Sequence, residues 1–173
     1  MIYRLLFVFS LSMGCTVAAA EPPKPGQSGP DAKAGPFKPA KDGSFTLHAR
    51  QATVHGTTLR YEPAENKNTL GFWTDVTDWA SWDLAVDHPA AFKVEILQGC
   101  GKDSGGSEVE VVLGRERFTF IVQETGHFQN FLRRQVGTLR VEKPGNYTLA
   151  FRPLKKTGRA IMDLREVSLK PSP

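Results

Sequence analysis

Apolar and polar residues alternate along most of this chain with a period of two. Trp82, Leu84 and Val86 share one phase of a single stretch, whereas Ser81 and Asp83 share the other. Such alternation is typical of a β-strand that lays one face on a core and turns the other outward. We therefore expect a strand here and place Trp82 in the core.

From Ser44 onward the same pattern predicts about nine strands and no helix. Turn residues separate the strands: Lys143-Pro-Gly-Asn146 offers a fixed φ and a permissive one, as a tight reversal requires. Short strands at this spacing predict an all-β fold, an antiparallel sandwich or jelly roll. The expected strands are Phe45–Val54, Thr58–Tyr61, Asp78–Val86, Phe92–Leu97, Glu108–Leu113, Arg117–Gln123, Leu132–Val141, Tyr147–Arg152 and Ala160–Leu169.

The first 42 residues do not follow this pattern. Residues 1–20 combine a basic start, an apolar run and the small residues Ala18-Ala19-Ala20, which predicts a signal peptide and a secreted or periplasmic protein. Residues 21–42 are rich in Pro, Gly and Lys, which predicts a disordered linker. Residues 43–173 then form one β-sandwich domain. Alternatively, Ser12-Met13-Gly14-Cys15 loosely resembles a lipobox, which would anchor the protein through a lipid on Cys15.

The net charge and the hydropathy of the chain indicate which classes of binding partner to expect. The net charge is +4, and cations are mixed with acids along the chain, so no nucleic-acid footprint emerges. A modest attraction to anionic polysaccharide stays open. No apolar run is long enough for a transmembrane span. If Cys15 leaves with the signal peptide, Cys100 has no intramolecular partner. It is then a small buried residue between two glycines or, alternatively, a reactive thiol that links two copies.

Motifs for catalysis are missing from the sequence. The four histidines are isolated, without the spacing that builds a zinc site, and no Gly-x-Ser-x-Gly elbow occurs. The glycine-rich stretch 99–106 lacks the Gly-Lys-Ser/Thr ending of a phosphate loop. We therefore expect a protein that is not an enzyme and that carries no cofactor.

Aromatic residues gather in the predicted loops and are the candidate binding residues. Phe72 and Trp73 cannot both face inward on a straight strand, so one of them should be exposed or line a cleft. Loop 126–131 combines imidazole, amide and aromatic groups, a mixture that suits ligand recognition. The alternative is that these rings plug the end of the sandwich. The candidate ligand-binding residues are Phe72, Trp73, Trp79, His127, Phe128, Asn130 and Phe131.

These segments resemble the carbohydrate-binding modules of families 6 and 35. The likeness spans most of the domain and rests on Gly71-Phe-Trp73, Asp78-Trp-Ala-Ser-Trp82 and Ile161-Met-Asp-Leu164. The chain is similar, more closely still, to an uncharacterised accessory domain found beside the catalytic domain of secreted bacterial sulfatases, through Lys67–Trp73, Gly99-Cys-Gly101 and Thr125–Phe131. The resemblance implies a galactose-binding-like jelly roll with a non-catalytic role.

The resemblance also implies where a sugar would bind. In the family-6 type modules, two loop aromatics sandwich a sugar, and these positions match Phe72 or Trp73 and Phe128 or Phe131. An asparagine near the last strand anchors the sugar in those modules. Its position falls at Ile161 or Met162 here, so the resemblance implies stacking without that polar anchor.

At the positions of the calcium site of those modules, this sequence departs further from the family pattern. Asp163 matches one acidic ligand, but His48 and Arg50 stand where two glutamates belong. Calcium needs several oxygen ligands, so no metal is expected. Our hypothesis is that Arg50 replaces the ion and pairs with Asp163.

Together these features predict a secreted, non-catalytic module that binds a polysaccharide, neutral or sulfated, by stacking aromatics on sugar rings. The alternative is a protein-interaction or structural accessory domain that partners a secreted hydrolase such as a sulfatase. A flat apolar patch would favour a protein partner, whereas a concave pair of rings would favour a sugar.

Overall fold

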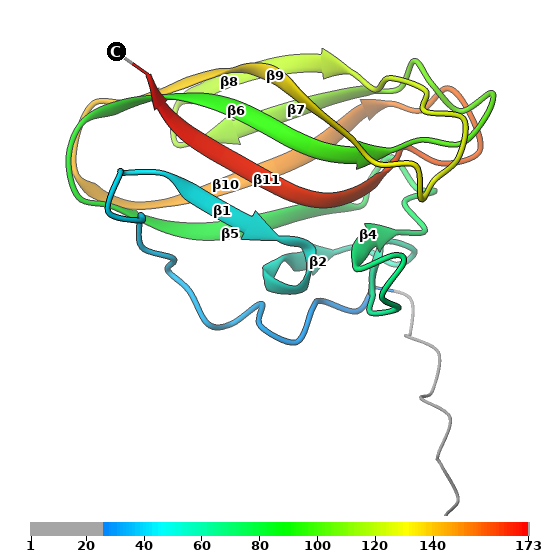
Figure 1. Cartoon of the computed structure of the whole chain (residues 1–173), viewed down its shortest axis with the longest axis horizontal. Helices are drawn as coiled ribbons and strands as arrows, with labels where there is room; N and C mark the ends of the chain where they lie inside the picture. The colour runs from blue at the N-terminus through cyan, green and yellow to red at the C-terminus, as the bar shows by residue number, and fades with distance from the viewer. Residues whose placement is uncertain (1–25, 173) are drawn as a thin grey trace, which may run out of the picture.

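The computed structural model describes residues 26–172 as two antiparallel β-sheets packed face to face (Figure 1). Within these residues, one 3-10 turn, η1 (Ala49–Gln51), interrupts the succession of strands. The predicted all-β sandwich is therefore confirmed. The strands are β1 (Phe45–His48), β2 (Thr53–His55), β3 (Arg60–Glu62), β4 (Thr69–Gly71), β5 (Trp79–Val86), β6 (Ala90–Gly99), β7 (Glu108–Leu113), β8 (Glu116–Ile121), β9 (Leu132–Val141), β10 (Gly145–Lys155) and β11 (Asp163–Ser172).

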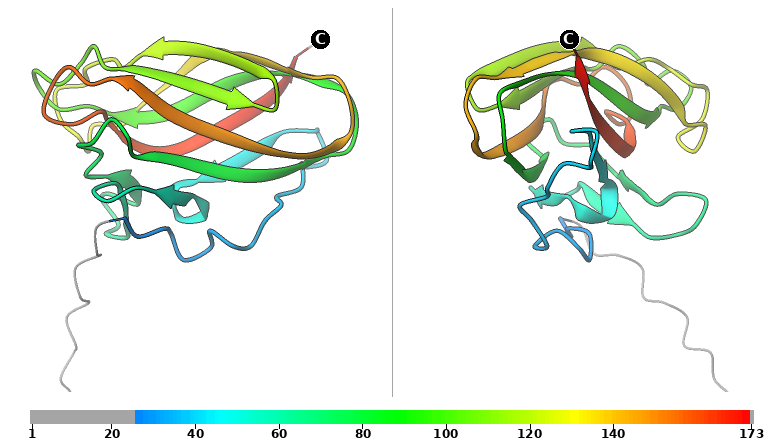
Figure 2. Two further views of the ribbon diagram at one scale, coloured as in Figure 1. Left: turned by 180° about the vertical axis from the view of Figure 1, so that it is seen from behind. Right: turned by 60° about the vertical axis from the view of Figure 1, so that its left-hand side comes forward.

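Each sheet joins strands that are distant in the sequence. The six-stranded sheet has the order β3-β4-β11-β6-β9, and β1 also pairs with β11. The five-stranded sheet has the order β2-β5-β10-β7-β8. Figure 2 shows the two layers from behind and from the side. Long connections at one end of the sandwich bring loops from several strands together.

The core lies between the sheets and is built from the inward phase of each strand. Trp82 and Phe151 meet edge to face, with 5.9 Å between ring centroids, and Phe45 and Phe92 meet in the same way from the other sheet. Trp82 is buried, as its phase predicts. Burying rings of this size supplies a large share of the apolar stabilisation of a sandwich.

Several strand ends shift by a few residues, and two departures from the expected strands change the arrangement of the sheets. The stretch predicted as one strand, Phe45–Val54, is split by η1, so β1 joins the six-stranded sheet and β2 joins the five-stranded one. Strand β4 was not predicted, because three residues are too few to show a period. It pairs with β3 over three positions and with β11 only at Leu164.

Residues 26–42, expected as part of a disordered linker, lie along the domain as an edge strap (Figure 1). Phe37 forms a parallel bridge with Leu84: its N–H donates to the Asp83 carbonyl, and the Ala85 N–H donates to the Phe37 carbonyl, both at 2.8 Å. Farther upstream, the Gly26 N–H donates to the Leu59 carbonyl. Composition alone missed this because a tertiary neighbour, the free edge of β5, supplies the hydrogen bonds.

The predicted signal peptide, residues 1–20, and the candidate lipidation site Cys15 lie outside the described residues. Among residues 26–172 no helix is long and apolar enough to cross a membrane.

Candidate functional site

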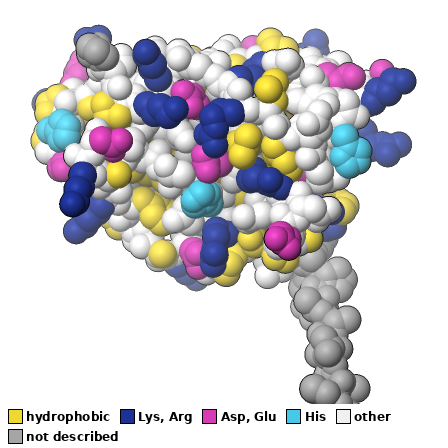
Figure 3. All heavy atoms as spheres, viewed as in Figure 1, with side chains coloured by type: hydrophobic (Ala, Val, Ile, Leu, Met, Phe, Trp, Pro, Cys, Tyr) yellow, Lys and Arg dark blue, Asp and Glu magenta, His cyan; other side chains and the backbone are white. Residues whose placement is uncertain are grey.

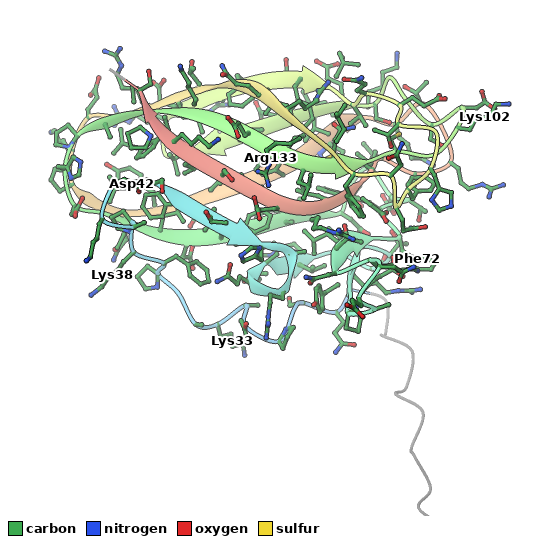
Figure 4. The ribbon with its side chains drawn as sticks, viewed as in Figure 1. Lys33, Lys38, Asp42, Phe72, Lys102 and Arg133 are labelled. Atoms are coloured by element: carbon green, nitrogen blue, oxygen red, sulfur yellow. The ribbon has the colours of Figure 1, made fainter. Side chains whose placement is uncertain are left out.

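A cleft of about 250 Å³ opens among the loops at one end of the sandwich. It combines two aromatic rings, two acidic and two basic side chains, and an amide. We call it the loop-end cleft. Its lining residues are Glu62, Lys67, Phe72, Thr74, Phe128, Gln129, Arg159, Ala160 and Asp163. Phe72 is labelled in Figure 4, at the right-hand end of the molecule.

Phe72 is the exposed member of its aromatic pair. Its backbone has φ of 55°, a left-handed conformation that aromatic residues rarely adopt, and its ring is 46% exposed. The Arg60 guanidinium lies over the ring, 3.4 Å from its centroid. Backbone strain of this kind costs of order 1 kcal/mol or more and is frequent at ligand sites.

Trp73, by contrast, is fully buried, and its indole N–H donates to the Asp78 carbonyl at 2.8 Å. The left-handed turn at Phe72 is what places these neighbours on opposite sides of the loop. The expectation that one of the pair is exposed is met by Phe72. Trp73 cannot contact a ligand and is removed from the candidate residues.

Phe128 reaches the cleft because two glycines leave room for it. A Cβ on Gly99 would collide with the Phe128 carbonyl oxygen, and a Cβ on Gly101 would collide with its ring. Gly101 also bridges to Gly126 at the start of the same loop. The two glycines of the Gly99-Cys-Gly101 motif therefore leave space, because they lack a Cβ, for the loop that carries Phe128 to pack closely against β6 and the residues after it.

Two buried carboxyl groups form the polar part of the cleft. Glu62 is 7% exposed and Asp163 is 4% exposed, and both approach the bare α-carbon of Gly71. Glu62 accepts an ion-pair hydrogen bond from Lys67 at 2.7 Å. Asp163 accepts a hydrogen bond from the neutral side-chain amide of Gln129 at 3.3 Å, which is the single hydrogen bond of the Asp163 side chain within the described residues. One carboxyl group is thus neutralised, and the other is poorly satisfied.

This difference sets the charge of Asp163. Burial raises the pKa of Asp163 to about 7, and the neighbouring Glu62 acts in the same direction. The hydrogen bond from Gln129 and the charges of Lys67 and Arg165 lower this pKa but do not cancel the effect of burial. Near neutral pH, therefore, the cleft contains a carboxyl group that can both donate and accept hydrogen bonds.

Trp79, another predicted site residue, lies away from this cleft on the outer face of the five-stranded sheet. Its ring stacks on His55, with 3.6 Å between centroids and 8° between planes, and the Arg152 guanidinium lies 3.8 Å from its centroid. Burial lowers the pKa of His55, and the charge of Arg152 adds to that effect. Since its neighbours already cover the ring, Trp79 offers no free face for a sugar.

The remaining predicted residues sit beside the cleft without lining it. Phe131 is half-buried beneath the Arg165 guanidinium, 3.7 Å from its ring centroid. The Asn130 amide donates to the Thr125 carbonyl, and the His127 ring accepts the Gln129 N–H. His127 and Asn130 therefore shape the loop that presents Phe128.

The calcium site implied by the resemblance does not fit these residues. Arg50 forms an ion pair with Asp31 at 2.8 Å, so the proposed pairing of Arg50 with Asp163 is wrong. His48 faces Glu166 at 3.5 Å, on the open face of the six-stranded sheet. Within residues 26–172 no three His, Cys, Asp or Glu side chains gather to hold a metal ion.

Sequence reasoning missed the polar lining of the cleft. Glu62, Lys67 and Arg159 carry no motif and are not among the candidate residues. Gln129 belongs to the loop predicted to recognise a ligand but is not singled out in it. Asp163 is considered only as a family metal ligand or a partner of Arg50. The available signal was the family position of Asp163 once its two glutamate partners were absent. A lone carboxyl group retained at a buried position needs another partner.

Comparison with known proteins places the chain in a family. The model described as "Domain of unknown function (DUF5077)" matches residues 38–173, most of the chain. The chain is a DUF5077 protein. Its family region starts next to Phe37, so it includes the whole sandwich and the end of the edge strap. A search among curated proteins finds no match to this DUF5077 chain.

Solved structures share the fold of this DUF5077 domain at low sequence identity. The C-terminal CBM6 of LamC from Zobellia galactanivorans is 15% identical with a TM-score of 0.59, covering 73% of this chain and 98% of that one. A family 35 module from Clostridium thermocellum is 9% identical with a TM-score of 0.60, covering 73% and 96%. CBM6cm-2 from Cellvibrio mixtus lichenase 5A, solved with cellotriose, is 15% identical with a TM-score of 0.58, covering 75% and 98%. The jelly roll of carbohydrate-binding modules is therefore the fold of this domain.

Proposed function

We propose that this DUF5077 protein is a non-catalytic carbohydrate-binding module that takes up a sugar in the loop-end cleft. The observation that carries the proposal is the pairing of two aromatic rings, Phe72 and Phe128, with the poorly satisfied carboxyl group of Asp163. A sugar ring offers apolar C–H faces to the former and hydroxyl groups to the latter. The names of the similar structures, which are carbohydrate-binding modules, support the same class of ligand.

The cleft offers a polar anchor that differs from the family asparagine. Ile161 at that position is buried in the core, and the hydrogen-bonding groups come instead from Asp163, Glu62 and Gln129. A carboxyl group near its pKa can accept from one hydroxyl and donate to another. Each aromatic contact adds only about 1 kcal/mol beyond burial, so we expect micromolar to millimolar affinity.

The proposal also includes export of the protein from the cytoplasm. We propose that the signal-peptide pattern of residues 1–20 directs the protein out of the cytoplasm, where polysaccharides are abundant. A separately encoded secreted enzyme, such as a sulfatase, is the partner expected if the sugar does not bind alone. In that case the same loops would dock on the enzyme.

The test is a glycan screen with the folded protein, followed by titration of each hit against two cleft variants. Phe72→Ala and Gln129→Ala should each weaken binding about five- to tenfold, since each removes one contact of about 1 kcal/mol. Phe131→Ala is the matched control, because this ring lies outside the cleft. Circular dichroism would verify that all variants are folded.

Saturable binding that Phe72→Ala weakens and Phe131→Ala leaves intact would support the proposal. If no glycan binds, or if both variants weaken it equally, the cleft is not the sugar site. Capture of a secreted enzyme by the wild type but not by Phe72→Ala would then favour the interaction module.

A further inference from the structure

Positive charge without acidic partners gathers around the loop-end cleft. Arg159 lines the cleft and is exposed, and it forms no ion pair with any residue of the described chain. Lys102 and Lys156, also exposed, likewise have no acidic partner among residues 26–172. We call Lys102, Lys156 and Arg159 the basic rim.

Two loops that touch each other carry the basic rim. The Thr157 N–H donates to the Ser107 hydroxyl at 3.2 Å, which joins the β10–β11 loop to the β6–β7 loop. Figure 4 shows Lys102 at the same end of the molecule as Phe72, and Figure 3 shows Lys and Arg side chains projecting from that end. The rim therefore lies at the same end of the molecule as the cleft, and Arg159 belongs to both.

Several cations elsewhere on the surface are neutralised by neighbours. Arg133 pairs with Glu166 and Lys170 pairs with Glu95, both at 2.7 Å, across the strands of the six-stranded sheet. Inside the cleft, Lys67 is likewise neutralised by Glu62. The charge of Arg159 is not cancelled in this way. The carboxyl group of Asp163, whose pKa burial raises to about 7, carries only part of a negative charge near neutral pH.

We propose that the glycan bound by this cleft is acidic, with a carboxylate or sulfate group held by Arg159 and the adjoining polymer attracted by Lys102 and Lys156. This inference rests on the proposed function and specifies its class of ligand. A guanidinium group presents paired donors that match the oxygens of either anion. Lysines beside it act as point charges that do not require one fixed geometry.

The same surface fits a polysaccharide better than a nucleic acid. Asp103 and Glu124 lie within the rim, joined by a hydrogen bond from the Asp103 N–H to the Glu124 carboxylate at 2.9 Å. These two acids interrupt the rim, whereas nucleic-acid surfaces carry uninterrupted runs of basic residues. A cleft of about 250 Å³ instead suits one or two sugar units.

The experiment compares polymers that differ only in charge, using the whole protein. Dextran sulfate is paired with dextran, and polygalacturonate with its carboxyl-reduced form, so the two arms separate sulfate from carboxylate. The acidic member of at least one pair should bind about tenfold more tightly at low salt, and added sodium chloride should reduce that preference. Duplex DNA serves as an unrelated polyanion.

Variants then locate the contact. Arg159→Gln should reduce the affinity for the acidic polymer about tenfold, and Lys102→Gln with Lys156→Gln should reduce it by a further few-fold. Lys143→Gln is the matched control, since it removes one exposed charge from the turn between β9 and β10, which lies at the opposite end of the sandwich (Figure 1). Lys102→Gln with Lys156→Gln should leave binding to a neutral glycan identified in the screen unchanged, because neither lysine lines the cleft.

Three results would overturn the inference. Equal affinity for the acidic and neutral members of both pairs would show a sugar site without charge selection, and the proposed function would stand. Equal losses in Arg159→Gln and Lys143→Gln, or equally tight binding of DNA, would show attraction by net charge alone. Failure of every acidic polymer to bind would remove the inference, and the proposed function would fall with it only if no glycan of the screen binds either.

Discussion

Asp78 and Asp163 are both buried carboxyl groups, yet their surroundings shift their pKa values in opposite directions. Burial alone would raise both. At Asp78, three backbone N–H groups and the Thr58 hydroxyl donate to the carboxylate at 2.7–2.9 Å, and these bonds lower its pKa despite burial. At Asp163 the one amide donor is too distant to compensate. Asp78 therefore organises the fold, whereas Asp163 keeps hydrogen-bonding capacity for a ligand.

The raised pKa of Asp163 predicts a dependence of stability on pH. The folded protein keeps this proton up to about pH 7, whereas an unfolded aspartate releases it near pH 4. Its contribution to the free energy of unfolding is therefore present below about pH 4 and is lost as pH rises towards 7, by at most about 1.4 kcal/mol per unit. Asp163→Asn should flatten this part of the profile, as measured by urea unfolding between pH 4 and 8.

The comparison needs an exposed carboxyl group outside the lining of the cleft. Glu65 is exposed in the β3–β4 loop, so Glu65→Gln should leave the pH profile of the wild type unchanged. If Asp163→Asn gives a profile parallel to that of the wild type, Asp163 is ionised in the folded state and the account of the cleft is wrong.

At this scale the sequence could predict that one of Phe72 and Trp73 points outward, but not which. Alternation fixes only that neighbours face opposite sides. The choice depends on the left-handed backbone at Phe72 and on the hydrogen bond from the Trp73 indole to Asp78, residues whose placement follows from the complete loop.

The loop elements depend on glycines for close approach. Gly99 at the end of β6 lies against the Phe128 backbone, and Gly101 lies against the Phe128 ring. A backbone cannot move aside as readily as a ring, so Gly99→Ala should cost about 2–3 kcal/mol and Gly101→Ala about 1 kcal/mol. Urea unfolding gives both values. Equal costs, or a larger cost at Gly101, would contradict the packing described for this loop.

The edge strap predicts a second element-scale effect. Phe37 is half-buried and packs against the core, and its backbone covers the edge of β5 beyond the end of β2. Phe37→Ala should lower the free energy of unfolding by about 2 kcal/mol. Hydrogen exchange at the Ala85 amide should quicken in the same variant.

Lys38 provides the comparison for the strap, since it is the exposed neighbour of Phe37. Lys38→Ala should change neither the stability nor the exchange of Ala85. Unchanged stability in Phe37→Ala would mean that the strap leaves the domain in solution, as a disordered linker would.

Most strands could be predicted because each buries one face, which leaves a period of two in the sequence. The exceptions are two segments whose backbone hydrogen bonds come from strands elsewhere in the chain. β4 and the strap owe their hydrogen bonds to β3, β11 and β5 rather than to their own composition. Local patterns do not record such partners, so propensity alone cannot find them.

On the scale of the whole molecule, the cleft combines β3, the loops after β3, β4, β8 and β10, and the start of β11. Glu62, Gln129 and Asp163 are about a hundred positions apart at the extremes, and no spacing rule links them. The two aromatic positions could be proposed by resemblance, since Phe72 and Phe128 both line the cleft. The polar groups required the three-dimensional arrangement.

Cys100 provides a reporter for unfolding of the whole domain. It is fully buried, and burial raises the pKa of its thiol to about 11, so it is neither reactive nor able to link two folded copies. In a Cys15→Ser variant, thiol labelling at mildly basic pH should be at least about a thousandfold slower than for an exposed cysteine, because it requires global opening. Urea at the unfolding midpoint should abolish the protection. Rapid labelling without urea, or a dimer that reductant dissolves, would contradict this burial.

The two ends of the described chain lie at opposite poles of the sandwich. Gly26 is bonded to Leu59, next to the strand that carries Glu62, whereas Ser172 pairs with Ala91 at the far end (Figure 1). A fusion partner or fluorophore placed ahead of Gly26 would be attached near the strand that carries Glu62, one of the cleft residues. For surface display or single-molecule work, the C-terminus is therefore the handle that leaves the cleft facing solution.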